Sequence, residues 1–153
     1  MYIPSGLIAA TILAFVSPVH AQERYKVEFT IKDDTGGKPQ PSLHYSMLVE
    51  ESRKAVFQAG SRVADGCSSQ LVDTGADIEL TAHTSDGKVA IEGAIDLTSI
   101  TGHVNLSSIC EPIIGQRKIV FNTAVELGKP TLILDDPKAL PLRQVEAVVT
   151  KVN

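Results

Sequence analysis

Asp73-Thr74-Gly75 is the one short motif in this sequence whose residue types could carry out catalysis. It places a carboxylate beside a hydroxyl and a glycine, and Leu71-Val72 precedes it. When two copies of such a segment meet, their two carboxylates share one proton and activate a water molecule. The same residues also suit a structural role, because aspartate and glycine are common at turns. The choice between these roles decides whether the chain is an enzyme.

The motif resembles the active-site turn of homodimeric, retroviral-type aspartic proteases, in which Asp73, Thr74 and Gly75 would be catalytic. Ile113-Ile114-Gly115 is similar to the apolar segment that packs beneath that turn in the family. However, no glycine-rich flap lies between the two segments, and residues 118–127 alternate as a strand where the family has a short helix. We therefore favour a turn that opens a strand and predict a chain that is not an enzyme, with the protease as the alternative.

Alternation of apolar and polar residues dominates the elements around this motif and is typical of strands with one buried face. Asp86-Gly87 between two alternating runs predicts a hairpin, and residues 61–70 and 99–115 are predicted to be loops. No long segment has a helical period. The sequence therefore predicts an all-β fold, a single antiparallel β-sandwich or barrel-like sheet of about 7–8 strands. The predicted strands cover residues 25–31, 43–49, 54–58, 78–82, 89–97, 119–127, 131–134 and 144–152.

Residues 1–21 have the features of a signal peptide. Ile8–Val16 is apolar but too short to span a bilayer, and the following segment ends in the small residue Ala21. We expect residues 22–153 to form a single β-rich domain without a transmembrane helix. The predicted location is the periplasm, the outer membrane or the extracellular space.

Cys67 and Cys110 are the only cysteines, and both lie in the exported part of the chain. An even number of cysteines in an oxidising compartment favours a disulfide. Closing the loop between residues 67 and 110 would stabilise the fold by roughly 4 kcal/mol. The three histidines of residues 22–153 are not at ligand spacing to the cysteines, so we predict neither a metal site nor a cofactor.

The charge of the chain argues against nucleic acid as a partner. The formal net charge is −4, and the lysines and arginines are scattered along the sequence. Nucleic-acid binding requires a basic surface with aromatic side chains for stacking, and this chain contains no tryptophan.

Residues 56–134 resemble the secretin domain of outer-membrane proteins from type II and type III secretion systems. In that domain an apolar-glycine strand end precedes a strand with an internal glycine, followed by a returning strand, a proline-isoleucine-arginine segment and a final hairpin. The corresponding segments here are Ala59-Gly60-Ser61-Arg62-Val63, residues 72–80, residues 87–91, Pro112-Ile113-Ile114-Gly115-Gln116-Arg117 and residues 121–130. The flanking residues 25–31 and 144–152 resemble those of small exported bacterial proteins of the Acidobacteria type.

The resemblance implies a non-enzymatic, exported β-domain that binds or assembles at the cell envelope. Its partners would be envelope or secretion-system proteins, or further copies of itself. One departure from the pattern is Leu134-Asp135-Asp136-Pro137, which stands where the family has Gly-Gly-Leu. A further alternative is a disulfide-stapled periplasmic module that binds a ligand or acts as an inhibitor.

Overall fold

The computed structural model describes residues 22–35, 38–39, 42–64, 71–106, 109–136 and 142–152. Every regular element in this part of the chain is a β-strand, which confirms the all-β prediction. The strands form two antiparallel sheets, each with four long strands, and a two-residue strand extends one of them. The predicted signal peptide, residues 1–21, lies outside the described residues and stays a prediction.

The first sheet, sheet A, combines the two ends of the chain. Its long strands follow the order β3-β1-β9-β8, and short β2 pairs with the end of β1. β8 is bulged, because Leu132 and Leu134 pair with consecutive residues of β9. The strands of sheet A are β1 (Arg24–Thr35), β2 (Lys38–Pro39), β3 (Leu43–Glu50), β8 (Thr131–Asp136) and β9 (Leu142–Val152).

The second sheet, sheet B, is a meander of longer strands in the order β4-β5-β6-β7. The predicted hairpin between β5 and β6 is confirmed: Asp86 and Gly87 have φ angles of 50° and 76°, as a tight two-residue turn requires. A bulge in β6 between Ile100 and Gly102 shifts its register with β7. The strands are β4 (Lys54–Ala64), β5 (Leu71–Ser85), β6 (Lys88–Leu106) and β7 (Ile109–Val125).

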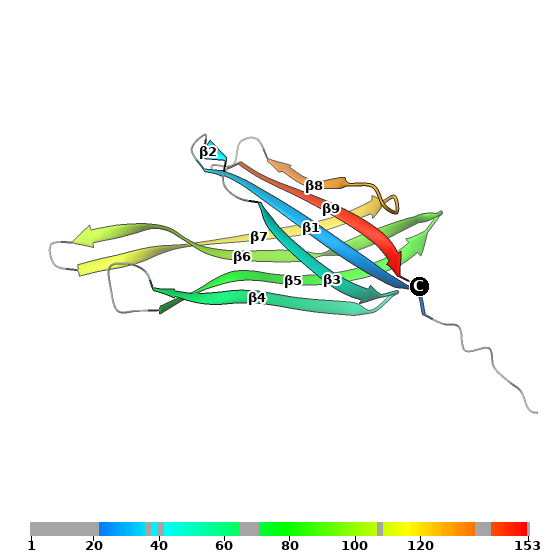
Figure 1. Cartoon of the computed structure of the whole chain (residues 1–153), viewed down its shortest axis with the longest axis horizontal. Helices are drawn as coiled ribbons and strands as arrows, with labels where there is room; N and C mark the ends of the chain where they lie inside the picture. Colours follow the sequence, from blue (N-terminus) through cyan, green and yellow to red (C-terminus); the bar gives the residue numbers. More distant parts are fainter. Residues whose placement is uncertain are drawn as a thin grey trace, which may run out of the picture.

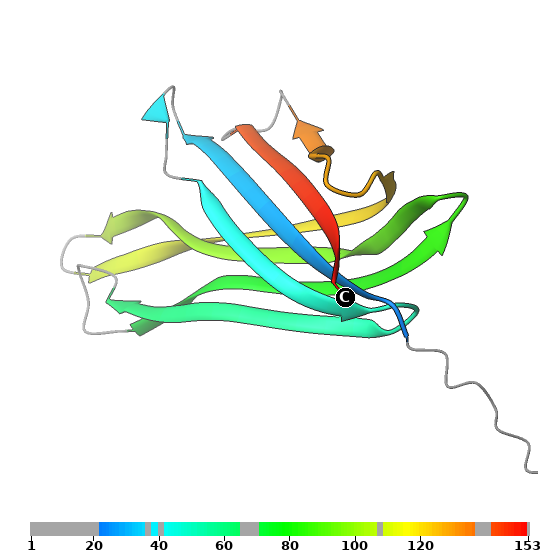
Figure 2. The same ribbon diagram turned by 45° about the vertical axis from the view of Figure 1, so that its right-hand side comes forward.

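The two sheets pack face to face, and β1, β3 and β9 run obliquely across sheet B (Figures 1 and 2). The alternating apolar residues of both sheets meet in one core. Phe29 of sheet A lies against Phe121 of sheet B, with ring centroids 5.9 Å apart. Phe121 is paired across the strands with Gly93, where an added Cβ would lie 2.0 Å from the Glu79 carbonyl oxygen. The fully buried large side chains are Tyr25, Val27, Phe29, Ile31, Val49, Ile78, Leu80, Val89, Ile91, Ile95, Val125 and Val145.

Sheet B reaches beyond sheet A at one end (Figure 1), and there the predicted loops are wrong at residues 61–64, 99–106 and 109–115. The rest of these predicted loops, residues 65–70 and 107–108, lies outside the described residues. Residues 61–64 continue β4, and residues 99–106 and 109–115 belong to β6 and β7. Among residues 61–64, 99–105 and 110–115 most are exposed, and residues 60–64 all are. A strand with no buried face has no need to alternate, so its sequence is indistinguishable from that of a polar loop.

Candidate functional site

Asp73-Thr74-Gly75 lies inside β5 and not in a turn, so the predicted strand-opening turn is wrong. These residues pair with Arg62, Ser61 and Gly60 of β4, respectively. An Asp73 carboxylate oxygen lies 2.8 Å from Nε of Arg62, and the Thr74 hydroxyl donates a hydrogen bond to the Ser61 carbonyl oxygen at 3.3 Å. All three residues therefore have strand partners.

This geometry does not favour the aspartic protease alternative. The Asp73 side chain is 78% exposed and is paired with a guanidinium, whereas two proteolytic carboxylates must share a proton. Ile113-Ile114-Gly115 lies in β7, and β6 separates that strand from β5. The apolar segment therefore does not pack beneath Asp73.

Gly60 and Gly75 lie directly opposite each other in β4 and β5. Gly75 has a φ angle of 153°, and an added Cβ would lie 2.1 Å from the Ala59 carbonyl oxygen and 2.6 Å from the Gly60 Cα. Only glycine allows the two strands to approach this closely. The Gly60–Gly75 pair contributes to the lining of a hollow on each face of sheet B.

The hollow on the inner face is a slot of about 550 Å³ between the two sheets, at the end where sheet B extends beyond sheet A. We call this the open end. None of the described residues that line the slot has a charged side chain. Small residues of sheet B replace the large core side chains found elsewhere, so the space between the sheets is not filled. Its lining consists of Ile31, Leu43 and Tyr45 of sheet A together with Ala59, Gly60, Ser61, Val63, Thr74, Gly75, Leu97, Thr98, Ser99 and Ile100 of sheet B.

The hollow on the outer face is polar and has a volume of about 560 Å³. The Gly60–Gly75 pair forms part of its lining, and the Arg62–Asp73 ion pair lies beside it. Gln58 and Asp77, which are cross-strand partners, complete the polar lining. The same short stretch of β4 therefore has an apolar hollow on one side and a charged hollow on the other.

The two outer strands of sheet B have one open edge each. Among the described residues, β4 pairs only with β5, and β7 pairs only with β6. Each strand therefore presents a row of backbone amide and carbonyl groups to solvent, which is a template for pairing with another chain.

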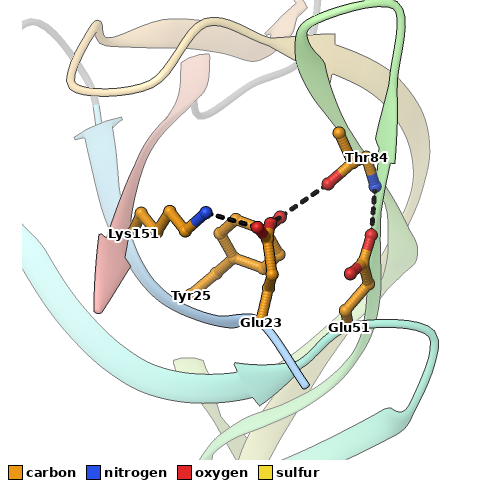
Figure 3. Close-up of polar contacts among 5 residues, drawn as sticks. All are labelled: Glu23, Tyr25, Glu51, Thr84 and Lys151. Carbon is orange, nitrogen blue, oxygen red and sulfur yellow. Dashed lines mark hydrogen bonds and ion pairs between the residues drawn. The ribbon is translucent and has the colours of Figure 1, made fainter. Parts of the chain in front are cut away.

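The opposite end of the sandwich is closed by a polar cluster that we call the clasp, defined as Glu23, Tyr25, Glu51, Thr84 and Lys151 (Figure 3). The buried Tyr25 hydroxyl donates to a Glu23 carboxylate oxygen at 2.6 Å and lies 2.7 Å from the Thr84 hydroxyl. Glu23 also accepts a hydrogen bond from Lys151, and Glu51 accepts one from the Thr84 amide at 3.0 Å. The clasp thus ties β1 and β9 of sheet A to β5 of sheet B.

The clasp shifts the pKa values of its ionisable groups. The hydrogen bonds from Lys151 and from Tyr25 lower the pKa of the Glu23 carboxyl. The same bond to Glu23 raises the pKa of Lys151, and burial together with the Glu23 bond raises the pKa of the Tyr25 hydroxyl. The folded protein therefore favours the ionised glutamate, the charged lysine and the neutral tyrosine.

The predicted disulfide is only half within the described part of the chain. Cys110 lies in β7, and no described cysteine is a free thiol. Cys67 lies outside the described residues. The Cys67–Cys110 pairing therefore stays a prediction.

Two kinds of feature are absent from the described residues. No three or more histidine, cysteine, aspartate or glutamate side chains gather there in a way that could hold a metal ion. In the same part of the chain, no helix has the length and apolar character needed to cross a membrane.

The fold defined by these two sheets is that of a secretin domain, which confirms the resemblance inferred from the sequence. Aeromonas hydrophila ExeD matches with a TM-score of 0.59 at 10% identity, over 86% of this chain and 49% of that chain. The type II secretion system secretin GspD of E. coli K12 matches with a TM-score of 0.51 at 10% identity, over 86% of this chain and 48% of that chain.

The Salmonella SPI-1 type III secretion injectisome secretin InvG matches with a TM-score of 0.51 at 12% identity, over 86% of this chain and 58% of that chain. This chain thus spans roughly half of the secretin structures that it matches. No protein-family model and no curated protein matches the sequence. The similarity lies in the fold, and it favours neither the protease nor the ligand-binding or inhibitor alternative.

Sequence reasoning identified Asp73, Thr74 and Gly75 but missed the features around them. Arg62 was assigned to a loop, although the positively charged residue opposite a strand aspartate is typical of a cross-strand ion pair. The slot was missed because it combines small residues from three strands. A signal was present in the paired small residues Gly60 and Gly75, since glycine within strands often marks a close approach.

Proposed function

We propose that this chain is an exported, non-enzymatic β-domain that acts at the cell envelope, in the periplasm or at the outer membrane. It works by binding or assembly through the open edges of sheet B. Its partners are envelope or secretion-system proteins, or further copies of itself. The secretin-like fold supports this proposal, and the single observation that carries it is the pair of unpaired edges at β4 and β7.

Self-assembly through these edges has a simple geometry. β4 and β7 are the two ends of one four-stranded sheet, so pairing β4 of one copy with β7 of the next is a head-to-tail contact. Such contacts close into rings when the rotation between subunits allows it. Pairing with a different protein would use the same backbone groups of one edge.

Light scattering of residues 22–153, with and without mild detergent, tests assembly. We expect an oligomer, and electron microscopy should show rings. A strict monomer in both conditions would reject self-assembly and leave binding to another polypeptide. If neither edge binds any chain, the proposed function is wrong.

The export and disulfide components of the proposal have their own tests. Expression of the full chain in a bacterium with a periplasm should yield a protein whose first residue is Gln22. Mass spectrometry without reductant should find Cys67 and Cys110 in one cross-linked peptide. Two free thiols would reject the disulfide, and an uncleaved N-terminus would reject the signal peptide.

A further inference from the structure

The outer half of β4, residues 59–64, combines an open edge with a hollow on each face of the sheet. A strand added beside β4 would lie about 4.8 Å away, and its side chains would point alternately to the two faces. Those on the inner face would lie at the slot, and those on the outer face would lie at the polar hollow. The two hollows therefore specify the side-chain pattern of an added strand.

The slot specifies uncharged, apolar side chains on the inner face. Ala59 and Val63 line it from β4, and Leu97 lies on its floor as part of the buried core. The polar groups in its lining are the uncharged hydroxyls of serine, threonine and tyrosine together with backbone. A charged side chain there would lose water without gaining a partner of opposite charge.

The outer hollow specifies polar side chains on the other face. Arg62, Asp73 and Asp77 contribute charges of both signs, and Gln58 contributes an amide. Asp77 forms no ion pair with another described residue. Polar and charged groups of an added strand would therefore find partners on this face.

Little in β4 protects its edge from pairing. The strand contains no proline, so every residue retains its backbone amide. Its two charged side chains lie across the sheet: Lys54 is 2.7 Å from Glu79, and Arg62 is 2.8 Å from Asp73. By contrast, β7 carries Pro112, and a proline on an edge strand limits edge-to-edge pairing.

We infer that residues 59–64 of β4 bind an extended segment of another polypeptide, which adds to sheet B as a fifth strand with apolar side chains toward the slot and polar side chains toward Arg62 and Asp77. This inference rests on the proposed edge-mediated function and names its site and partner chemistry. Backbone hydrogen bonds to β4 supply affinity, and the two hollows select the alternating sequence.

Selection from a random library of displayed peptides about nine residues long tests this inference. The target is the folded, oxidised protein, residues 22–153. We expect the enriched peptides to alternate apolar and polar residues, and synthetic copies to bind in solution. Enrichment of peptides without alternation, or no enrichment at all, would overturn the inference.

Two kinds of variant locate the binding site. Gly60→Pro and Ser61→Pro each remove one backbone amide. The amides of successive strand residues point to opposite sides, so one of these two points away from β5. The variant that removes it should keep the fold and lose peptide binding. Val63→Glu places a charge at the slot and should weaken binding about tenfold or more. Its control is Val56→Glu, on the same strand but outside both hollows. Ile113→Pro and Ile114→Pro on β7 are the control for the opposite edge.

The outcomes separate this inference from the proposed function. Peptide binding that survives both in the proline variant of β4 that keeps its fold and in Val63→Glu would overturn the inference, whatever the mass of the protein. An oligomer that dissociates in the folded proline variant of β4, and that added peptides do not dissociate, would show that a second copy occupies β4. That result would support the proposed function and overturn the inference. A monomer that binds alternating peptides at β4 would support the inference and reject self-assembly.

Discussion

The clasped end and the open end of the sandwich are filled by different kinds of side chain. At the clasped end, Tyr25 is 1% exposed and its hydroxyl joins the two sheets through Glu23 and Thr84. At the open end, Gly60 and Gly75 pair across β4 and β5 and line the hollows on both faces of sheet B. One end is thus closed by large side chains and hydrogen bonds, whereas the other keeps a slot of about 550 Å³.

The difference indicates that one end of the fold provides stability and the other end provides a binding surface. Burial of large apolar side chains supplies most of the folding free energy, and these residues lie in the core between the sheets. The open end buries little and therefore adds little stability, but its backbone edge and hollows remain accessible. Changes at the clasp and core should affect stability, and changes at the open end should affect binding.

The largest effect is expected for Phe29→Ala. Phe29 is 1% exposed and contacts Phe121 across the core, so the substitution leaves a large cavity and should lower the free energy of unfolding by about 3–5 kcal/mol. Leu43→Ala, at the slot, removes a side chain that is already 47% exposed and should cost less than about 1 kcal/mol. Urea denaturation measures the free energy of unfolding of both variants. Equal losses of free energy in the two variants would contradict the difference between core and slot.

Gly75→Ala should have the next largest effect. An added Cβ would collide with the β4 backbone, so β4 must move away from β5, at a cost above about 1 kcal/mol. The matched control is Gly87→Ala in the hairpin turn, where φ is 76° but no atom lies within 4 Å of the added Cβ. Hydrogen exchange should accelerate along residues 59–64 only in Gly75→Ala. Unchanged exchange there would contradict the close approach.

The sequence predicted those strands that have one buried face. Tyr25–Ile31 alternates because its odd-numbered side chains enter the core. Asp86-Gly87 indicates the hairpin between β5 and β6 because that turn needs positive φ angles. Residues 60–64 and 101–105 were missed because most of them are exposed, so burial of one face imposes no periodicity on them. The resemblance to secretin domains supplied the fold that periodicity alone left open.

The candidate site was harder to predict than the fold. Asp73 and Gly75 were identified as notable residues, but their partners Arg62 and Gly60 follow only from the register of β4 and β5. The clasp was not predicted because Glu23 and Lys151 lie at opposite ends of the sequence. Local sequence patterns do not predict which distant strands pair with each other.

Tyr25→Phe tests the clasp itself. The variant keeps the buried ring but removes the hydrogen bonds to Glu23 and Thr84, and we expect it to lower the free energy of unfolding by about 1–2 kcal/mol. Tyr45→Phe is the matched control at the slot, because the Tyr45 hydroxyl forms no hydrogen bond with another described residue. Thermal unfolding measures both variants. An equal loss in the two would show that the clasp adds no stability.

The smallest effect is the pH dependence of the clasp. Because the Lys151 bond lowers the pKa of Glu23 below its usual value of 4.5, the unfolded chain takes up this proton first as the pH falls. The stabilisation is therefore present above pH 4.5 and is lost as the pH falls through the folded pKa. Glu79 and Glu126 have lowered pKa values and contribute with the same sign. We expect the melting temperature to fall on acidification, and the difference between the wild type and Glu23→Gln to shrink.

Lys151→Met separates the contribution of the clasp to the pH dependence of stability from the contribution of the other glutamates. Lys151→Met and Glu23→Gln both remove the Glu23–Lys151 ion pair, so the double variant should melt no lower than the less stable single variant, and each variant should have a smaller acid dependence than the wild type. On the alkaline side, the raised pKa values of Lys151 and Tyr25 mean that their stabilisation is lost as the pH rises above 10. Additive losses in the double variant would contradict a direct Glu23–Lys151 contact, and the clasp would then depend on the hydrogen bonds of Tyr25, Thr84 and Glu51.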